Sequence, residues 1–164
     1  MTTTDSEAPA KPPKPLTSAQ KAKEEKKKRE EAVFLARALE RIKVLQDAKR
    51  LESSFFEFVK SSWSQFDPAE FEENWHLRDL CDHMEAASLG YIRRGVWNVP
   101  PRTAKSNIVS ICFPAWIWAQ TEKTALRGPQ VQFFYASYSH ELALEHSLKC
   151  RRLIESPWYS STLG

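Results

Sequence analysis

The order of segments in this 164-residue chain predicts an α/β fold, a parallel sheet with flanking helices, preceded by a long basic helix and a disordered tail. Two β-prone runs, 95–99 and 131–136, each precede a helical pattern. Strands that alternate with helices favour a parallel sheet with right-handed crossovers. Two strands cannot cover the faces and edges of such a sheet, so we expect the opening of a larger domain. The predicted boundaries are a tail at 1–17, a helix at 18–60 and an incomplete α/β domain at 61–164.

The first segments differ sharply in composition. Residues 1–16 combine small polar residues with prolines, which block helical and ladder hydrogen bonds, and we expect them to be disordered. From Ser18 to Lys60 the chain has no Gly or Pro and is rich in helix formers. Apolar residues recur at helical spacing at Leu35, Leu39, Ile42 and Leu45. This helix is either an extension that packs its second half on the body, or a surface for dimerisation or partner docking.

The elements after the long helix follow from turns and caps. A turn at Asp67-Pro68 leads into a helical pattern that ends near Gly90, a residue suited to a C-cap. Residues 95–99 are predicted to form a buried strand, which Pro100-Pro101 ends because proline cannot donate a ladder hydrogen bond.

Two further elements complete the predicted order. A third, well-buried helix begins near Lys105, with a kink expected at Pro114. After the second strand, Val131 to Ala136, a last helix begins with Ser139 as its N-cap.

Bulk composition limits the class of protein. The net charge is only +3, and the lysines concentrate near the start, which indicates a solvated segment or a specific contact with DNA, RNA or a partner. Cys81, Cys112 and Cys150 form no CxxC pair, so neither a disulfide framework nor a zinc knuckle is predicted. The chain shows no apolar stretch long enough for a membrane span and no secretory signal, and we expect a soluble, cytosolic protein.

The loop "PPRTAKS" is the main candidate site, because a loop that opens a helix presents free N–H groups and a positive dipole end to a phosphate. Lys105 and Ser106 stand in the last two positions of the phosphate-loop pattern GxxxxGK[ST], but Ala104 stands where that pattern has glycine. From the residues alone, the segment is either a nucleotide loop or a proline turn with an exposed lysine. Arg102 and Lys105 lie near a helix N-terminus, where a cation is unfavourable unless an anion joins it.

Two stretches, "NVPPRTAKSNIVSICFPAW" and "FFYASYSHELALEHSLKCRRLIESPWYSS", resemble the large subunit of tailed-bacteriophage terminases. The resemblance implies the N-terminal portion of a P-loop NTPase, the ATP-hydrolysing motor that packages viral DNA into proheads, with ATP and Mg²⁺ as cofactors. It implies a nucleotide site made of Pro101, Arg102, Thr103, Ala104, Lys105 and Ser106. In it Lys105 binds phosphate, Arg102 senses or stabilises the γ-phosphate, and the Ser106 hydroxyl binds Mg²⁺. The helix that carries His76 resembles the family segment near the adenine pocket.

The resemblance also implies partners and a location. They are double-stranded DNA, the terminase small subunit and the portal protein, with a homo-oligomer on the portal, in the cytoplasm of a bacterial host. The acidic strand and the nuclease ligands that the family uses do not occur before Gly164, so we expect the chain to be inactive alone. The alternative is a non-catalytic fragment or interaction protein that uses the basic N-terminal helix to bind DNA or a partner.

Two other groups of residues are weaker candidates for a functional site. His76, Cys81 and His83 lie on differing sides of one predicted helix, which disfavours a metal site. Aromatic residues near the C-terminal end suit either a base-stacking surface or core packing: Tyr135, Tyr138, Trp158 and Tyr159.

Overall fold

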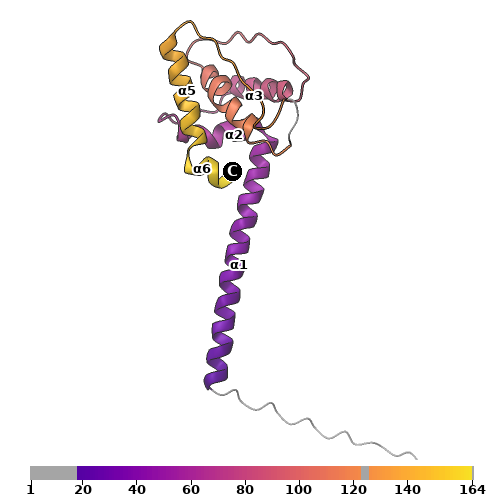
Figure 1. Ribbon diagram of the computed structural model, residues 1–164, viewed down its shortest axis with the longest axis vertical. Coiled ribbons are helices and arrows are strands. Elements are labelled where there is room, and N and C mark those ends of the chain that lie inside the picture. The colour runs from indigo at the N-terminus through magenta and orange to yellow at the C-terminus, as the bar shows by residue number, and fades with distance from the viewer. Residues whose placement is uncertain (1–17, 123–125, 164) are drawn as a thin grey trace, which may run out of the picture. The chain divides into compact units, whose positions relative to one another are not determined.

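The computed structural model describes residues 18–122 and 126–163, and the predicted tail at 1–17 lies outside them. All regular structure in the described residues is helical (Figure 1). The elements are α1 (Ser18–Ser53), α2 (Phe55–Ser62), η1 (Trp63–Gln65), α3 (Trp75–Ser88), η2 (Asn107–Cys112), α4 (Phe113–Trp118), α5 (His140–Ile154) and α6 (Pro157–Leu163). The chain divides into two compact units, Met1–Arg41 and Ile42–Gly164.

The prediction of an α/β fold with a parallel sheet is wrong, and so is the P-loop NTPase fold that the resemblance implies. Residues 95–99 and 131–136 have no regular secondary structure, and the part of the chain that the structure describes contains no strand or sheet. Val96, in the segment predicted as a buried strand, is 87% exposed. The second segment packs one side on a helix: the Phe133 ring lies 5.5 Å from that of Trp118, and the Trp118 indole N–H donates to the Val131 carbonyl. The alternating pattern therefore produces an irregular segment on a helix and not a ladder.

Helices in the unit Ile42–Gly164 enclose an aromatic core. Phe55 and Phe58 of α2, and Trp116 of α4, are almost completely buried. The rings of Phe55 and Trp116 lie 5.1 Å apart, and the Trp116 indole N–H donates to the carbonyl of Leu51 near the end of α1. From α6, the Tyr159 hydroxyl donates to the Ala115 carbonyl at 2.8 Å. These hydrogen bonds satisfy the polar ends of buried aromatic side chains, as burial requires.

Local caps explain where several helices begin and end. The predicted helix 18–60 breaks at Ser54, which is extended (φ −137°) and accepts a hydrogen bond from the Glu57 N–H, so that α2 begins at Phe55. The predicted C-cap at Gly90 is confirmed: its φ is +83°, its N–H donates to Ala87, and the next N–H donates to Ala86. This pair of bonds is the Schellman motif, which glycine favours because it lacks a Cβ.

The predicted third helix is present but contains an irregular section. Its first turn closes when the Ile108 N–H donates to the Ala104 carbonyl, so the helix begins at Lys105. The section η2 is a π-helix, and the Phe113 N–H donates five residues back to Ile108. Pro114 then stands at the start of α4, where its missing N–H is tolerated because the hydrogen-bond register is already changing.

Candidate functional site

The loop at Pro100–Ser106 folds back on itself. The Thr103 hydroxyl donates to the Pro100 carbonyl at 2.7 Å. The Lys105 ammonium lies 3.5 Å from the Val99 carbonyl and 3.4 Å from the Pro100 carbonyl. Both hydrogen bonds are long and their acceptors are uncharged carbonyls, so the ammonium keeps its full charge. It can therefore exchange them for a stronger, anionic acceptor.

The sign of the backbone angle φ alternates from residue to residue in this loop. Arg102 (φ 63°) and Ala104 (φ 58°) are the positive-φ residues other than glycine among those described, and Thr103 between them is not in that region. Alternation of this kind is the pattern by which a turn can direct successive N–H groups toward one concave side, as in an anion-binding nest. Each left-handed residue with a Cβ costs about 1–2 kcal/mol. The sequence showed that a glycine was missing at 104, but not that the left-handed conformation is kept without it.

The helix that follows has an uncapped start. Ala104, the residue before this helix, has no side-chain acceptor, and the Ser106 hydroxyl in the first turn makes no capping bond. Unpaired N–H groups and the helix dipole together favour an anion at this end. The nest and the helix start are therefore two adjacent features of the same polarity.

Two cations border the loop. Arg102 is exposed and Lys105 is half-buried. Neither forms an ion pair within residues 18–122 and 126–163. Positive charge placed at a helix start without an acidic partner is unfavourable, which is consistent with a site that awaits an anion.

Magnesium would find few protein ligands here. The described residues hold no group of three His, Cys, Asp or Glu side chains that could bind a metal ion. The Ser106 hydroxyl is half-buried and makes no hydrogen bond within those residues. Mg²⁺ commonly takes its remaining ligands from phosphates and water, so one hydroxyl suits an ion that arrives with a nucleotide.

Helix α3 and the loop share two cavities of about 450 Å³ each. His76 lines both, together with Thr103. The first cavity also has the rings of Trp75 and Trp97 on its walls. The structure thus brings the predicted upstream helix against the loop, in a space large enough for part of a nucleotide.

Asp67 is a positioning residue, whereas the sequence predicts only a turn at this residue. Its carboxylate accepts hydrogen bonds from the Asn107 amide at 3.1 Å and from the Ala69 N–H at 3.0 Å. The Lys149 ammonium of α5 lies 3.9 Å from the same carboxylate, and both side chains are largely buried. The network ties the first turns after the loop to α5. The Asp-Pro turn was the signal for its location, but nothing local marked its distant partners.

The other candidate groups are structural. Cys81, Cys112 and Cys150 are free and buried. Burial raises the pKa of the Cys81 thiol to about 12 and that of Cys150 to about 11, so both are protonated near neutrality. Cys81 is fully buried whereas His83 is partly exposed, as expected for differing helix sides. Tyr159 is buried and Trp158 packs on Phe58, so core packing holds for that pair, whereas Tyr138 is 96% exposed.

Comparisons with protein-family models, with curated proteins and with solved structures find no match to this chain. Among the described residues, none of the helices combines the length and apolar character needed to cross a bilayer.

Proposed function

We propose that the loop Pro100–Ser106 binds the phosphates of ATP together with Mg²⁺. The observation that carries this proposal is the alternation of left-handed Arg102 and Ala104 directly before an uncapped helix start. A turn with alternating φ, a positive helix end and two cations that have no ion pair among the described residues all favour the same ligand, a multiply charged anion.

The roles of the residues follow from their positions. Lys105 exchanges its long bonds to the Val99 and Pro100 carbonyls for phosphate oxygens. Arg102 is exposed at the outer edge of the loop and contacts the terminal phosphate, whose charge is the most accessible. The Ser106 hydroxyl would supply one protein ligand to a Mg²⁺ ion bound together with the nucleotide.

The resemblance to terminase large subunits extends this proposal to a biological role. In that role the bound ATP drives packaging of double-stranded DNA, with the small subunit and the portal as partners and with copies of the chain assembled on the portal. Hydrolysis also needs an acidic group to orient water and Mg²⁺, and the loop itself carries none. Our proposal for the described residues is therefore ATP binding.

The test compares Lys105→Ala with the control Lys49→Ala, an exposed lysine of α1. Isothermal titration of the full chain with Mg-ATP measures affinity, and circular dichroism verifies folding. We expect Lys105→Ala to weaken binding about 10- to 100-fold, the usual loss for a charged hydrogen bond, and Lys49→Ala to leave it unchanged. Equal affinity in both variants contradicts the proposal.

A second candidate function is self-association through α1. In the unit Met1–Arg41, the charged side chains pair with each other along the helix, as Lys26 does with Glu30 and Lys28 with Glu24. That pairing reduces the field available to DNA. Apolar side chains in the same unit are exposed instead: Phe34 (72%), Leu35 (59%) and Leu39 (59%). Exposed apolar residues at helical spacing favour a helical protein partner over a nucleic acid.

Sedimentation equilibrium of the full chain tests this candidate. We expect association that depends on concentration and that the double variant Leu35→Glu/Leu39→Glu abolishes. The matched control is Lys27→Glu/Arg37→Glu, which changes exposed charged residues of the same helix. A wild-type chain that remains monomeric at all concentrations excludes it.

A further inference from the structure

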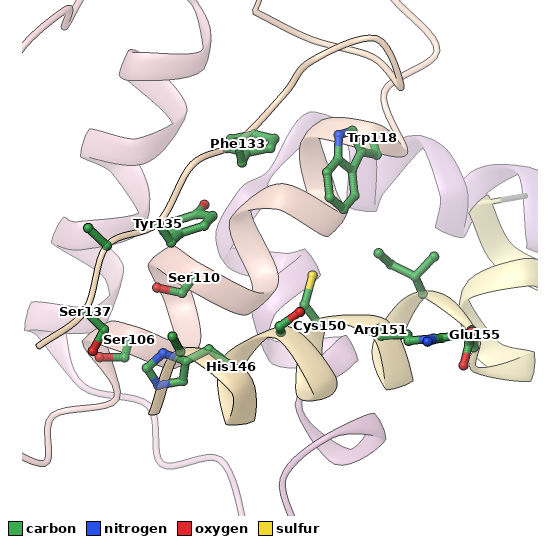
Figure 2. A pocket seen from close by; sticks show the side chains of 14 residues that line it. Ser106, Ser110, Trp118, Phe133, Tyr135, Ser137, His146, Cys150, Arg151 and Glu155 are labelled. Carbon is green, nitrogen blue, oxygen red and sulfur yellow. The ribbon is translucent and has the colours of Figure 1, made fainter. Parts of the chain in front are cut away.

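A larger cavity, of about 600 Å³, lies on the α5 side of the helix that begins at Lys105 (Figure 2). Its walls come from three separate segments: that helix, residues 133–137 and α5. Ser106 is the residue of the phosphate loop that lines it, whereas Arg102 and Lys105 do not. This volume is in the range of small-molecule sites.

One wall of this cavity is aromatic. The rings of Phe133 and Tyr135 are nearly parallel, at 12°, with centroids 6.1 Å apart. Their positions are fixed, because the Tyr135 hydroxyl donates to the Val109 carbonyl and Phe133 packs edge-on against Trp118. Cys150 and Ile154 of α5 contribute apolar groups to the lining. An aromatic wall together with apolar groups suits a planar ring, which gains stacking and apolar contact together.

Hydrogen-bonding groups also converge on the cavity. The hydroxyls of Ser106, Ser110 and Ser147 line it, and none of them forms a hydrogen bond within residues 18–122 and 126–163. No buried polar side-chain atom in those residues lacks a partner, so these hydroxyls are open to solvent or to a ligand. They give the cavity a polar edge beside its aromatic wall.

The charges on the lining cancel. Arg151 and Glu155 pair with each other at 2.8 Å, and both side chains are mostly exposed. Lining of this kind gives no net attraction to an anion or a cation. It therefore differs from the phosphate loop, where both charged residues are cationic.

We propose that this cavity binds an uncharged, planar heteroaromatic ring with hydrogen-bonding groups on its edge, the chemistry of a nucleobase in a nucleoside. Phe133 and Tyr135 form the stacking wall, and the hydroxyls of Ser110 and Ser147 recognise the polar edge. This site is separate from the proposed phosphate site, because its recognition requires neither Arg102 nor Lys105.

The experiment uses adenosine and uridine as probes, since neither carries a phosphate. Titration calorimetry of the full chain measures their affinity. The blocking variant is Ser147→Phe, which places a ring in the cavity from an exposed position, and the second variant is Phe133→Ala. The matched control is Leu144→Phe, which adds a ring to an exposed position of α5 outside the cavity.

We expect saturable binding of at least one nucleoside, weakened at least tenfold by Ser147→Phe and by Phe133→Ala. Leu144→Phe and Lys105→Ala should bind it as the wild type does. Circular dichroism checks that each variant folds. The inference is overturned if neither nucleoside binds saturably, or if a folded Ser147→Phe protein binds with unchanged affinity. Because Lys105→Ala distinguishes the phosphate loop from this cavity, either site can fail without the other.

Discussion

Two helices of this chain, α5 and the helix that begins at Lys105, differ in their first turns. Helix α5 begins with Ser139 in the extended region (φ −119°), whose hydroxyl accepts a hydrogen bond from the Leu142 N–H. The other helix begins after Ala104 at φ 58°, with a cation as its first residue and without a side-chain cap. The α5 start uses its own side chain to satisfy a free N–H group, whereas the Lys105 start does not.

The start of α5 stabilises the helix through its own cap, whereas the uncapped start at Lys105 leaves N–H groups that a ligand can use. An N-cap serine typically contributes about 1 kcal/mol, and left-handed alanine costs about 1–2 kcal/mol. Strained positions of this kind cluster at ligand-binding sites, where a bound anion offsets their cost. This difference between the two helix starts is the physical basis of the ATP proposal.

The largest effect is expected from pH, because each of the two helices buries a thiol. Burial raises the pKa of Cys112 strongly and that of Cys150 to about 11, from an ordinary value of 9.0. A raised pKa in the folded state means that the folded protein holds protons which the unfolded chain releases. The stabilisation is complete below pH 9 and is lost as pH rises toward the folded values.

Denaturant unfolding between pH 8 and 10.5 should therefore show a falling free energy of unfolding. Each thiol contributes at most about 1.4 kcal/mol per pH unit above its unfolded pKa. Cys112→Ala should reduce the slope more than Cys150→Ala, since Cys112 is completely buried. A pH-independent stability over this range contradicts the prediction.

The next effect concerns Asp67, which links the two helices. Asp67→Ala removes the acceptor for the partly buried Asn107 amide and one of the two carboxylate partners of Lys149, which keeps its ion pair with Glu145. We expect a loss of about 2 kcal/mol in thermal or chemical unfolding. The control Glu145→Ala removes a bond of Lys149 to an exposed carboxylate and should change stability by less than about 0.5 kcal/mol. Similar losses in both variants would mean that Asp67 does not hold the helices together.

The helix starts also show how far the sequence specifies this molecule. Ser139 as N-cap and Gly90 as C-cap were predicted correctly, because capping depends on one residue and its nearest neighbours. The strands were not, because a strand requires a hydrogen-bonding neighbour that no local pattern encodes. Phe133 and Phe134 show the failure: one packs on α4 while the other is 94% exposed, which satisfies a period of two without a ladder.

The candidate sites divide in the same way. The position of Lys105 and Ser106 at a helix start was predictable, because a proline turn and a helical pattern meet there. The conformation of Ala104 was not, since alanine gives no signal for a positive φ. The cavity beside α5 was also missed, because three segments distant in sequence build its walls.

A smaller effect, of opposite sign, is expected at Ala104. Ala104→Gly keeps the φ of 58° and removes the Cβ that strains it, so we expect the free energy of unfolding to rise by about 1 kcal/mol. Mg-ATP affinity should be retained, because the N–H groups of the nest stay in place. A glycine variant that is less stable than the wild type would show that the left-handed conformation is not what the native loop adopts.

The smallest expected effect comes from making the same substitution, serine to alanine, in the first turn of one helix and at the N-cap of the other. This pair compares the two helix starts most directly. Ser139→Ala removes the hydroxyl that accepts from the Leu142 N–H, and we expect a loss of about 1 kcal/mol. Ser106→Ala removes a hydroxyl that caps nothing, so its stability should change by less than about 0.5 kcal/mol. The effects on Mg-ATP binding should follow the opposite order, with a loss of affinity only in Ser106→Ala. The dependence of that affinity on Mg²⁺ should also weaken, because the Ser106 hydroxyl is the proposed metal ligand. Unfolding curves and Mg-ATP titrations of the two variants measure the change in stability and the change in affinity. If Ser106→Ala destabilises the fold as much as Ser139→Ala while leaving ATP affinity intact, the helix start at Lys105 serves the fold and not a ligand.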